Sequence, residues 1–444
     1  MRLRLPSTFR NPELPVLLAL SCLTRFWGLF DPRVVVWDEV HFVRFAAAYL
    51  NGTYYLDVHP PVAKMLLAGA ARLFGVTAET LSLNESAPAM RRLPALAGAL
   101  IIPVVYLLLR EVGAGRRVAT LGAVLLLVDN ALLVESRFIL TDGLLLLFGM
   151  TAVLLFVAAE RRSGSARWAC LAASAVASGL AAGTKWTGLS ALGLILLAWS
   201  VSLLRQRRAA SVRLGEAAIL LIVPAAVYAG AFAVHFTLLR QSAPFAKSFV
   251  ELHRTMLSIN IGWATDTNAG ASPWYTWPIA KHSIGFWSAP GADGASERWI
   301  VLLANPIVWW GTLVGVAAVV IAAMVHRAAL ERHRAVLLFL AAGYALNFVP
   351  FAFIHRPMYL YHYFFALIFS AMFAVMGVGA LAGWTDDEDA PPWRFSLPRS
   401  AALYGVILVF AASMFLYLAP MSYGWPLSAR AVLHRRWVVE RHGA

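Results

Sequence analysis

The chain has 444 residues, of which 60% are hydrophobic and 14% are charged, and its formal net charge is +14. This composition excludes an ordinary soluble globular protein. It indicates a polytopic membrane protein whose helices need about 20 apolar residues each to cross the bilayer. The positive charge does not predict nucleic-acid binding, because the basic residues cluster in short connections between apolar segments.

Apolar segments recur along the whole chain, and we predict an all-α membrane protein with about 11 transmembrane helices in one domain that covers 1–444. The first segment carries Arg25 and has no small-residue cleavage site, so we interpret it as a retained span. The predicted spans cover residues 14–30, 93–110, 117–134, 140–159, 168–184, 186–204, 215–237, 300–325, 335–354, 359–382 and 400–420.

The distribution of arginine predicts how these spans are oriented. With the N-terminus in the cytoplasm, four cytoplasmic connections are rich in arginine, as the positive-inside bias requires. They contain Arg110, Arg116 and Arg117, then Arg161, Arg162 and Arg167, then Arg205, Arg207, Arg208 and Arg213, and finally Arg327, Arg332 and Arg334. The arginine-rich tail disagrees, since eleven spans put it outside, but four loops outweigh one tail. We therefore expect a multi-pass membrane protein whose arginine-rich connections face the cytoplasm.

Two long connections fall on the outer side in this topology. The first, 31–92, has apolar residues at helical spacing over 39–50 and 60–75, which predicts short helices at the membrane interface. The second, 238–299, is rich in Trp, Pro, Gly and Ser, and tryptophan at this density favours the membrane–water boundary.

The first outer loop contains an adjacent pair of carboxylates, Asp38 and Glu39. Neighbouring residues point in different directions, so the two carboxylates should have different tasks. One can act as a general base, and the other can bind sugar hydroxyls or hold a loop. A structural alternative is a helix N-terminus that Asp38 caps and Glu39 stabilises.

The same loop continues with Asp57, His59 and a Pro60-Pro61 corner. Because a proline pair ends an extended segment and begins a helix at a fixed angle, it places Lys64 one turn into that helix. A lysine at this position suits a phosphate group.

Ionisable residues in three other stretches lie near the outer ends of predicted spans, where each one needs a reason. Arg137, Lys185 and Arg356 could each extend to the lipid headgroups or pair with a carboxylate. Together they favour a polar cavity that opens outward and suits an anionic headgroup such as a lipid phosphate. The stretches hold Glu135, Arg137 and Asp142, then Lys185, then His355, Arg356 and His362.

Seven segments, in order, resemble the protein O-mannosyltransferases, glycosyltransferase family 39 of the GT-C class. They are WDEVHFVRFAAAYLNGTYYLDVHPPVAKML from Trp37, MRRLPALAG from Met90, ESRFILTDG from Glu135, GTKWTGL from Gly183, ELHRTM from Glu251, NPIVWWG from Asn305 and LYHYFFAL from Leu360. Any one of them is a weak signal, whereas seven in the right order are strong.

The resemblance implies a GT-C fold and the transfer of mannose from polyprenyl-phosphate-mannose to Ser or Thr of secreted or membrane proteins, with inversion at the anomeric carbon. It implies Asp38 as the general base and Glu39 as a support for the acceptor or for Asp38. Four cations are implied for the departing phosphate, and no metal or other cofactor is implied. These cations are Lys64, Arg91, Arg137 and Lys185, while Asp57, His59, Asp142, His253, Arg356 and His362 are candidates for the cavity wall or the acceptor site.

The chain departs from the family pattern in its second outer loop. Eukaryotic members carry a large β-trefoil (MIR) insertion there, whereas here Ser242 is followed directly by Ala243 and Pro244. The resemblance therefore implies a compact prokaryotic form in the cytoplasmic membrane, with its active site on the outer side and an undecaprenyl-like or decaprenyl-like carrier.

Two alternatives stay open at this point. A transferase that moves another sugar to lipid A or a cell-wall glycan would use the same carboxylates and cations. A transporter for a lipid-linked sugar would also need membrane cations, but these should then lie near the midplane rather than at the outer ends of the helices.

Overall fold

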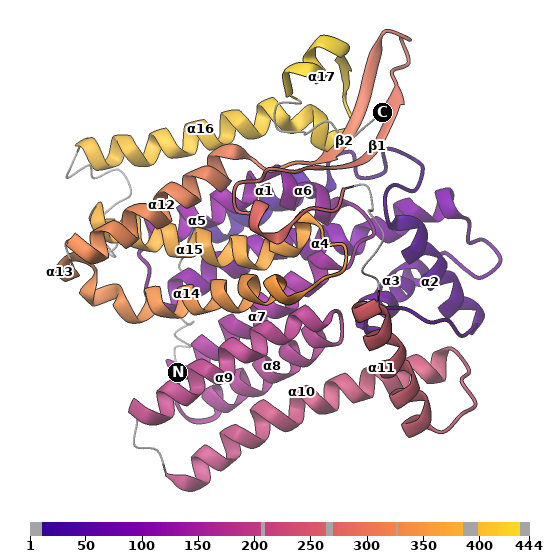
Figure 1. Cartoon of the computed structure of the whole chain (residues 1–444), viewed down its shortest axis with the longest axis horizontal. Helices are drawn as coiled ribbons and strands as arrows, with labels where there is room; N and C mark the ends of the chain where they lie inside the picture. Colours follow the sequence, from indigo (N-terminus) through magenta and orange to yellow (C-terminus); the bar gives the residue numbers. More distant parts are fainter. Residues whose placement is uncertain (1–10, 206–208, 263–269, 326, 385–397, 436–444) are drawn as a thin grey trace, which may run out of the picture.

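The computed structural model describes residues 11–205, 209–262, 270–325, 327–384 and 398–435. Part of the charge on which the predicted topology rests lies outside these ranges, including Arg207 and Arg208 and two of the four arginines of the tail, Arg436 and Arg441. Within them the chain is mostly helical (Figure 1). The helices of the first half are α1 (Glu13–Phe26), α2 (Glu39–Asn51), α3 (Val62–Leu73), α4 (Leu83–Glu111), α5 (Arg116–Leu127), α6 (Asn130–Arg137), α7 (Asp142–Glu160), α8 (Gly164–Ala182) and α9 (Leu189–Arg205).

The second half adds eight helices and three short strands within the described residues. The helices are α10 (Ala210–Leu238), α11 (Phe245–Gly262), α12 (Pro306–Val325), α13 (Arg327–Leu330), α14 (Arg334–Phe348), α15 (Phe364–Leu381), α16 (Pro398–Tyr423) and α17 (Ala429–Arg435). The strands are β1 (Ile284–Pro290), β2 (Ser296–Leu302) and β3 (Pro426–Ser428).

Eight segments of the described chain are long and apolar enough to cross a membrane, and a ninth is the pair α5 and α6, bent by 60°. These nine coincide with predicted spans. The other two predicted spans, 14–30 and 168–184, correspond to α1 and α8, which do not reach the same length and apolarity, so the count of eleven is not confirmed. For α1 the reason is length, since 14 helical residues rise about 21 Å.

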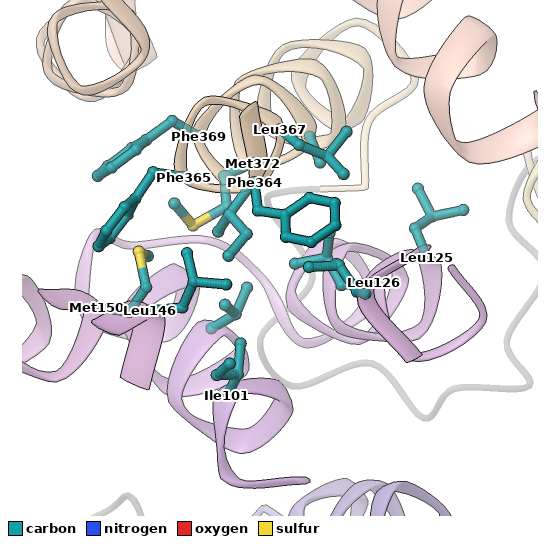
Figure 2. Packing of buried hydrophobic residues seen from close by; sticks show 14 of the residues in the cluster. Ile101, Leu125, Leu126, Leu146, Met150, Phe364, Phe365, Leu367, Phe369 and Met372 are labelled. Atoms are coloured by element: carbon teal, nitrogen blue, oxygen red, sulfur yellow. The ribbon is translucent and has the colours of Figure 1, made fainter. Parts of the chain in front are cut away.

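The core of the bundle lies around α4, α7 and α15, the most buried of the spanning helices. Figure 2 shows Phe364 and Phe365 of α15 close to Leu126 of α5 and to Leu146 and Met150 of α7. By contrast, α10 and α16 bury few residues and present apolar side chains outward. An apolar outer surface of this kind is suited to lipid.

Segments far apart in the sequence meet at one end of the bundle, on the right in Figure 1: α2 and α3, the tip of α10 with α11, and the β1–β2 hairpin. The predicted helices of the first outer loop are confirmed, because α2 and α3 occupy 39–51 and 62–73. The end of α9, the start of α10 and α13 lie at the opposite end, with Arg205, Arg213 and Arg327. These three arginines belong to the connections that the predicted topology assigns to the cytoplasm, although α2, α3 and α11 at the other end also carry arginine, at Arg44, Arg72 and Arg254.

A small sheet was missed by the all-α prediction. β2 pairs antiparallel with β1 on one side and with β3 on the other. The predicted span 300–325 was therefore too long at its start, because the strand runs to Leu302 and α12 begins at Pro306. The tryptophans of 284–302 were assigned to the membrane boundary, and a short aromatic run does not distinguish a strand from an interfacial segment.

Candidate active site

Asp38 lies directly before α2, half-buried, and its carboxylate accepts no hydrogen bond from the described residues. It occupies the N-cap position, but its backbone is helical (φ −76°, ψ −2°) and its side chain does not cap the helix. The capping alternative is therefore not supported. Burial raises the pKa of Asp38, while His41 and Lys185 act in the opposite direction. An uncommitted carboxylate with a raised pKa suits a general base.

Glu39 has a different environment from its neighbour. It is fully buried and forms a bidentate ion pair with Arg91, with Arg91 Nε 2.8 Å from Oε1 and Nη2 2.6 Å from Oε2. The same carboxylate accepts the backbone N–H groups of Val36 and Ile139, each at 2.9 Å. Arg91 also donates to the Pro32 carbonyl at 2.7 Å. Glu39 and Arg91 thus join the first outer loop to α4 and to the loop after α6.

Lys185 and Asp142 form the second buried ion pair of this end, with Lys185 Nζ 2.5 Å from Asp142 Oδ2. Lys185 precedes a short 3-10 helix, Trp186–Gly188, and Asp142 is the first residue of α7. Both act electrostatically on Asp38. Asp38, Asp142 and Lys185 therefore belong to one charged group, assembled from three separate segments.

A cavity of about 320 Å³ extends from this group between α7, α9, α14 and α15. Asp142, Asn347, Tyr361 and His362 supply polar groups, and Ser190 Oγ donates to Asn347 Oδ1 across α9 and α14 at 2.5 Å. The remaining wall is apolar. It is formed by Leu145, Leu146, Trp186, Leu189, Gly193, Leu346, Pro350, Phe351, Ile354 and Phe365, together with Thr187. The cavity is thus polar near Asp142 and apolar along the helices, as an amphiphilic ligand requires.

Arg356 and two histidines complete the polar end. Arg356 is half-buried, and none of the described residues accepts a hydrogen bond from it. The charge of Arg356 acts on both His59 and His362. Burial, together with the positive charges of Lys185, Arg356 and Lys64, lowers the pKa of His59 well below its usual value. His362 lines the cavity and stacks on Trp277 at 6.0 Å. Arg356 is the cation of this group that lacks a carboxylate partner among the described residues.

All four predicted phosphate ligands have protein partners: besides Arg91 and Lys185, described above, these are Lys64 and Arg137. Lys64 is buried, pairs with Asp57, donates to the His59 carbonyl at 2.7 Å and lies over the rings of Phe45 and Tyr55. Arg137 donates to three carbonyls at the end of α1, those of Arg25 (3.1 Å), Trp27 (2.5 Å) and Gly28 (3.0 Å). It satisfies acceptors that the end of a helix leaves open.

His253 lies apart from this group. Its Nε2 is 2.8 Å from the Tyr228 hydroxyl and its Nδ1 is 2.7 Å from the Phe249 carbonyl. It borders a second apolar cavity of about 640 Å³ between α9 and α10. Trp186 lines both cavities, so His253 is separated from the first one by this ring.

Sequence reasoning assigned no role to two residues of the site: it named Glu135 only as an ionisable residue near the outer end of a span, and it did not single out Tyr361. Tyr361 lies beneath the Lys185 ammonium, 5.4 Å from the ring centroid, and lines the cavity. Glu135 is buried, neither of its oxygens has a hydrogen-bond partner in the described chain, and Asp38 and Lys185 act on it. The sequence did point to Glu135, because a carboxylate at the end of a membrane span is uncommon. Tyr361 had no such signal, because tyrosine is common at the ends of membrane helices. The described residues contain no group of three or more His, Cys, Asp and Glu that could hold a metal ion.

Comparison with known families accounts for almost the whole chain. The profile of the family described as "Dolichyl-phosphate-mannose-protein mannosyltransferase" matches residues 16–240, slightly more than half of the chain. A second profile, the C-terminal four-transmembrane region of protein-O-mannosyltransferase, matches residues 245–441. The chain belongs to the protein O-mannosyltransferase family.

Relatives within this protein O-mannosyltransferase family are considerably longer than the chain. Protein O-mannosyltransferase 1 of Drosophila pseudoobscura pseudoobscura is 35% identical over 246 residues, which is 51% of this chain and 27% of that protein. Dolichyl-phosphate-mannose--protein mannosyltransferase 1 of Saccharomyces cerevisiae is 34% identical over 278 residues, 58% of this chain and 34% of that one. The matched region thus spans about a third or less of these two relatives.

A solved structure supports the fold that the family resemblance implies. The chain is similar to a subunit of the Saccharomyces cerevisiae protein O-mannosyltransferase Pmt1-Pmt2 complex bound to the sugar donor, with a TM-score of 0.85. The match covers 98% of this chain and 93% of that one at 18% sequence identity. The expected GT-C architecture of this protein O-mannosyltransferase is confirmed.

Proposed function

We propose that this protein transfers mannose from a polyprenyl-phosphate-mannose of the dolichyl-phosphate type to Ser or Thr hydroxyls of proteins, with inversion at the anomeric carbon. Family membership supports the reaction, since the matching family and its relatives carry this donor and protein acceptors in their names. One observation assigns the reaction to this site. Asp38 has no hydrogen-bond partner in the described chain, and it belongs to the same charged group as Lys185 and Asp142, next to an amphiphilic cavity.

The donor lipid fits the cavity in one orientation. Its isoprenoid chain would lie along the apolar lining of α7, α9 and α15, and its phosphate would reach the polar end near Asp142. There Lys185 and Arg356 are the cations that we assign to the phosphate. Lys185 is itself paired with Asp142, but Asp142 and the Tyr361 ring beneath its ammonium both line the cavity. The described partners of Lys64, Arg91 and Arg137, the other predicted ligands, do not line it, so we assign these three cations to holding the site in shape.

The chemical step then needs only a base and cations. The acceptor hydroxyl oxygen attacks the anomeric carbon, the bond from that carbon to the phosphate oxygen breaks, and the electron pair leaves with the phosphate. Asp38 takes the hydroxyl proton, a contribution typically worth about 10²- to 10⁴-fold in rate. Lys185 and Arg356 stabilise the negative charge that grows on the leaving phosphate. The products are an α-mannoside and the polyprenyl phosphate.

We further propose that this chemistry takes place at the outer face of the cytoplasmic membrane. The site lies at the end of the bundle that holds α2 and α3, opposite the end with Arg205, Arg213 and Arg327 (Figure 1). Arginine marks the cytoplasmic side of membrane proteins, which supports an outward-facing site.

Reconstitution tests this function directly. Purified protein in detergent is incubated with polyprenyl-phosphate-mannose and a Ser/Thr-rich peptide, and mass spectrometry and NMR report on the peptide and its linkage. We expect an α-linked hexose on Ser or Thr and an equal amount of released polyprenyl phosphate. Transfer to lipid A or a glycan, with an unmodified peptide, would overturn the proposal in favour of the alternative transferase.

A further inference from the structure

Among the residues that the structure describes, no strand pairs with the outer edge of the β1–β2 hairpin. The strand order is β1-β2-β3, so β2 is the central strand and β1 is an edge strand on the side away from β3 and α17 (Figure 1). In an antiparallel ladder, alternate residues turn their N–H and C=O groups away from the partner strand. No described residue forms a backbone hydrogen bond with these outward groups of Ile284–Pro290.

This edge strand is joined to the candidate base by a stack of aromatic rings. The register of β1 on β2 shifts between Gly285 and Trp287, so Phe286 is the additional residue of a bulge. Its ring is parallel to that of Trp37, with centroids 5.6 Å apart, and Tyr359 packs edge-on against the same indole at 5.9 Å. Trp37 directly precedes Asp38.

The backbone of Trp37 is strained, which shows how firmly this stack holds it. Its φ is +48°, in the left-handed region that a residue with a large side chain rarely adopts. Its indole N–H has no hydrogen-bond partner in the described chain, so ring packing is what fixes the side chain. Such strain persists only where the surroundings impose it. The edge strand β1 and the backbone at Asp38 are therefore held at a fixed relation through Trp37.

We infer that the outer edge of β1 receives the acceptor polypeptide as an added strand and so delivers its Ser or Thr to Asp38. This inference rests on the proposed function and specifies its acceptor: an extended, unfolded segment recognised through its main chain. An unpaired strand edge is complementary to an extended peptide, because the same alternation of N–H and C=O repeats along both. Recognition of this kind tolerates many sequences around the hydroxyl residue.

A second copy of the chain is the competing occupant of this edge. The bulge at Phe286 and the proline at the end of β1 shorten the regular edge, so that it is too short for the extended pairing of two identical edges. A single acceptor segment needs only the few residues that lie beside the Trp37 stack. The geometry therefore favours the acceptor.

Peptides with N-methylated amides test this inference on the unaltered protein. One Ser/Thr peptide is made in two series: the first is N-methylated at every second amide, and the second at the amides in between. Both series therefore lose the same number of N–H donors. A bound strand uses only one of these sets. We expect one series to raise the peptide KM about fivefold for each lost hydrogen bond, with the other series and the donor KM unchanged.

Amide hydrogen exchange gives an independent measurement. In the Asp38→Asn variant, which should bind peptide without reacting, the peptide should slow exchange at alternate amides of 284–290. If both series have the same KM and the unmodified peptide still receives mannose, strand addition is overturned while the proposed function stands. If the β1 amides are protected without peptide and this protection disappears on dilution, the edge pairs with a second copy of the chain, and this result would also overturn strand addition by the acceptor. Absence of transfer to any peptide would instead contradict the proposed function.

Discussion

The Arg91 guanidinium donates to both oxygens of the Glu39 carboxylate, at 2.8 and 2.6 Å, and both side chains are fully buried. The pair fixes the first outer loop on α4, and it leaves the neighbouring Asp38 facing the charged group of Lys185 and Asp142. Two adjacent acidic residues thus divide structure and chemistry between them. The predictions below separate these two roles.

Replacing Asp38 with Asn should remove the general base and leave the fold intact. We expect the rate of mannose transfer to fall by about 10²- to 10⁴-fold. The melting temperature in detergent should not fall, because the carboxylate accepts no hydrogen bond from the described residues. Release of polyprenyl phosphate and thermal unfolding are the two measurements, and a variant with wild-type turnover would refute the assignment of the base.

Replacing Glu39 with Gln, unlike replacing Asp38, should destabilise the protein. Removing one partner of a buried ion pair leaves the other charge uncompensated, which typically costs about 3 to 5 kcal/mol. Denaturant unfolding in detergent measures the change, and the exposed Glu79→Gln is the matched control, expected within about 0.5 kcal/mol of wild type. Arg91→Met should lower stability similarly, and the double variant should lose less than the sum of both changes.

Replacing Arg356 with Ala should weaken use of the donor without a loss of stability. No described residue accepts a hydrogen bond from Arg356, so its removal leaves no known partner exposed. We expect the donor KM to rise, kcat to fall at least tenfold, and the peptide KM to stay unchanged. The exposed Arg44→Ala on α2 is the matched control. Equal kinetics for both variants would exclude Arg356 from the phosphate site.

The pH dependence of transfer should reflect the environment of Asp38. Burial raises its pKa, so the active, deprotonated form is lost as the pH falls through a value above the ordinary aspartate pKa of about 3.9. The electrostatic effect of His41 lowers the pKa of Asp38, so His41→Gln should move the acid limb of kcat/KM to higher pH. A limb that moves to lower pH, or stays in place, would contradict this electrostatic relation.

Filling the apolar part of the cavity should impair donor binding. Gly193 lines the cavity, and a Cβ added there meets no heavy atom within 4 Å, so Gly193→Leu should fold normally. We expect the donor KM to rise, and to rise further for donors with longer isoprenoid chains. Gly230→Leu on α10 is the control, since that glycine also has open space but lies outside this cavity. Unchanged donor kinetics in Gly193→Leu would place the lipid elsewhere.

Several features of this protein followed from local sequence patterns. The apolar segments gave the helical membrane class, the spacing around Pro60-Pro61 gave α3, and the motif order gave the family. The different environments of Asp38 and Glu39 were also predicted, because adjacent side chains diverge. These are short-range properties, and a linear pattern carries them.

Tertiary structure decided which charges remain available for chemistry. In the sequence Lys64, Arg91, Arg137 and Lys185 are equivalent cations near the outer ends of helices. Their partners come from distant segments: Arg91 meets Glu39, and Arg137 meets the carbonyls at the end of α1. The strand β3 and the ring of Phe286 on Trp37 likewise depend on contacts across more than 100 residues. The sequence by itself determined the class, the family and the polar residues, and only the folded chain decided which of them pair with one another, because a charge is neutralised by what lies beside it in space.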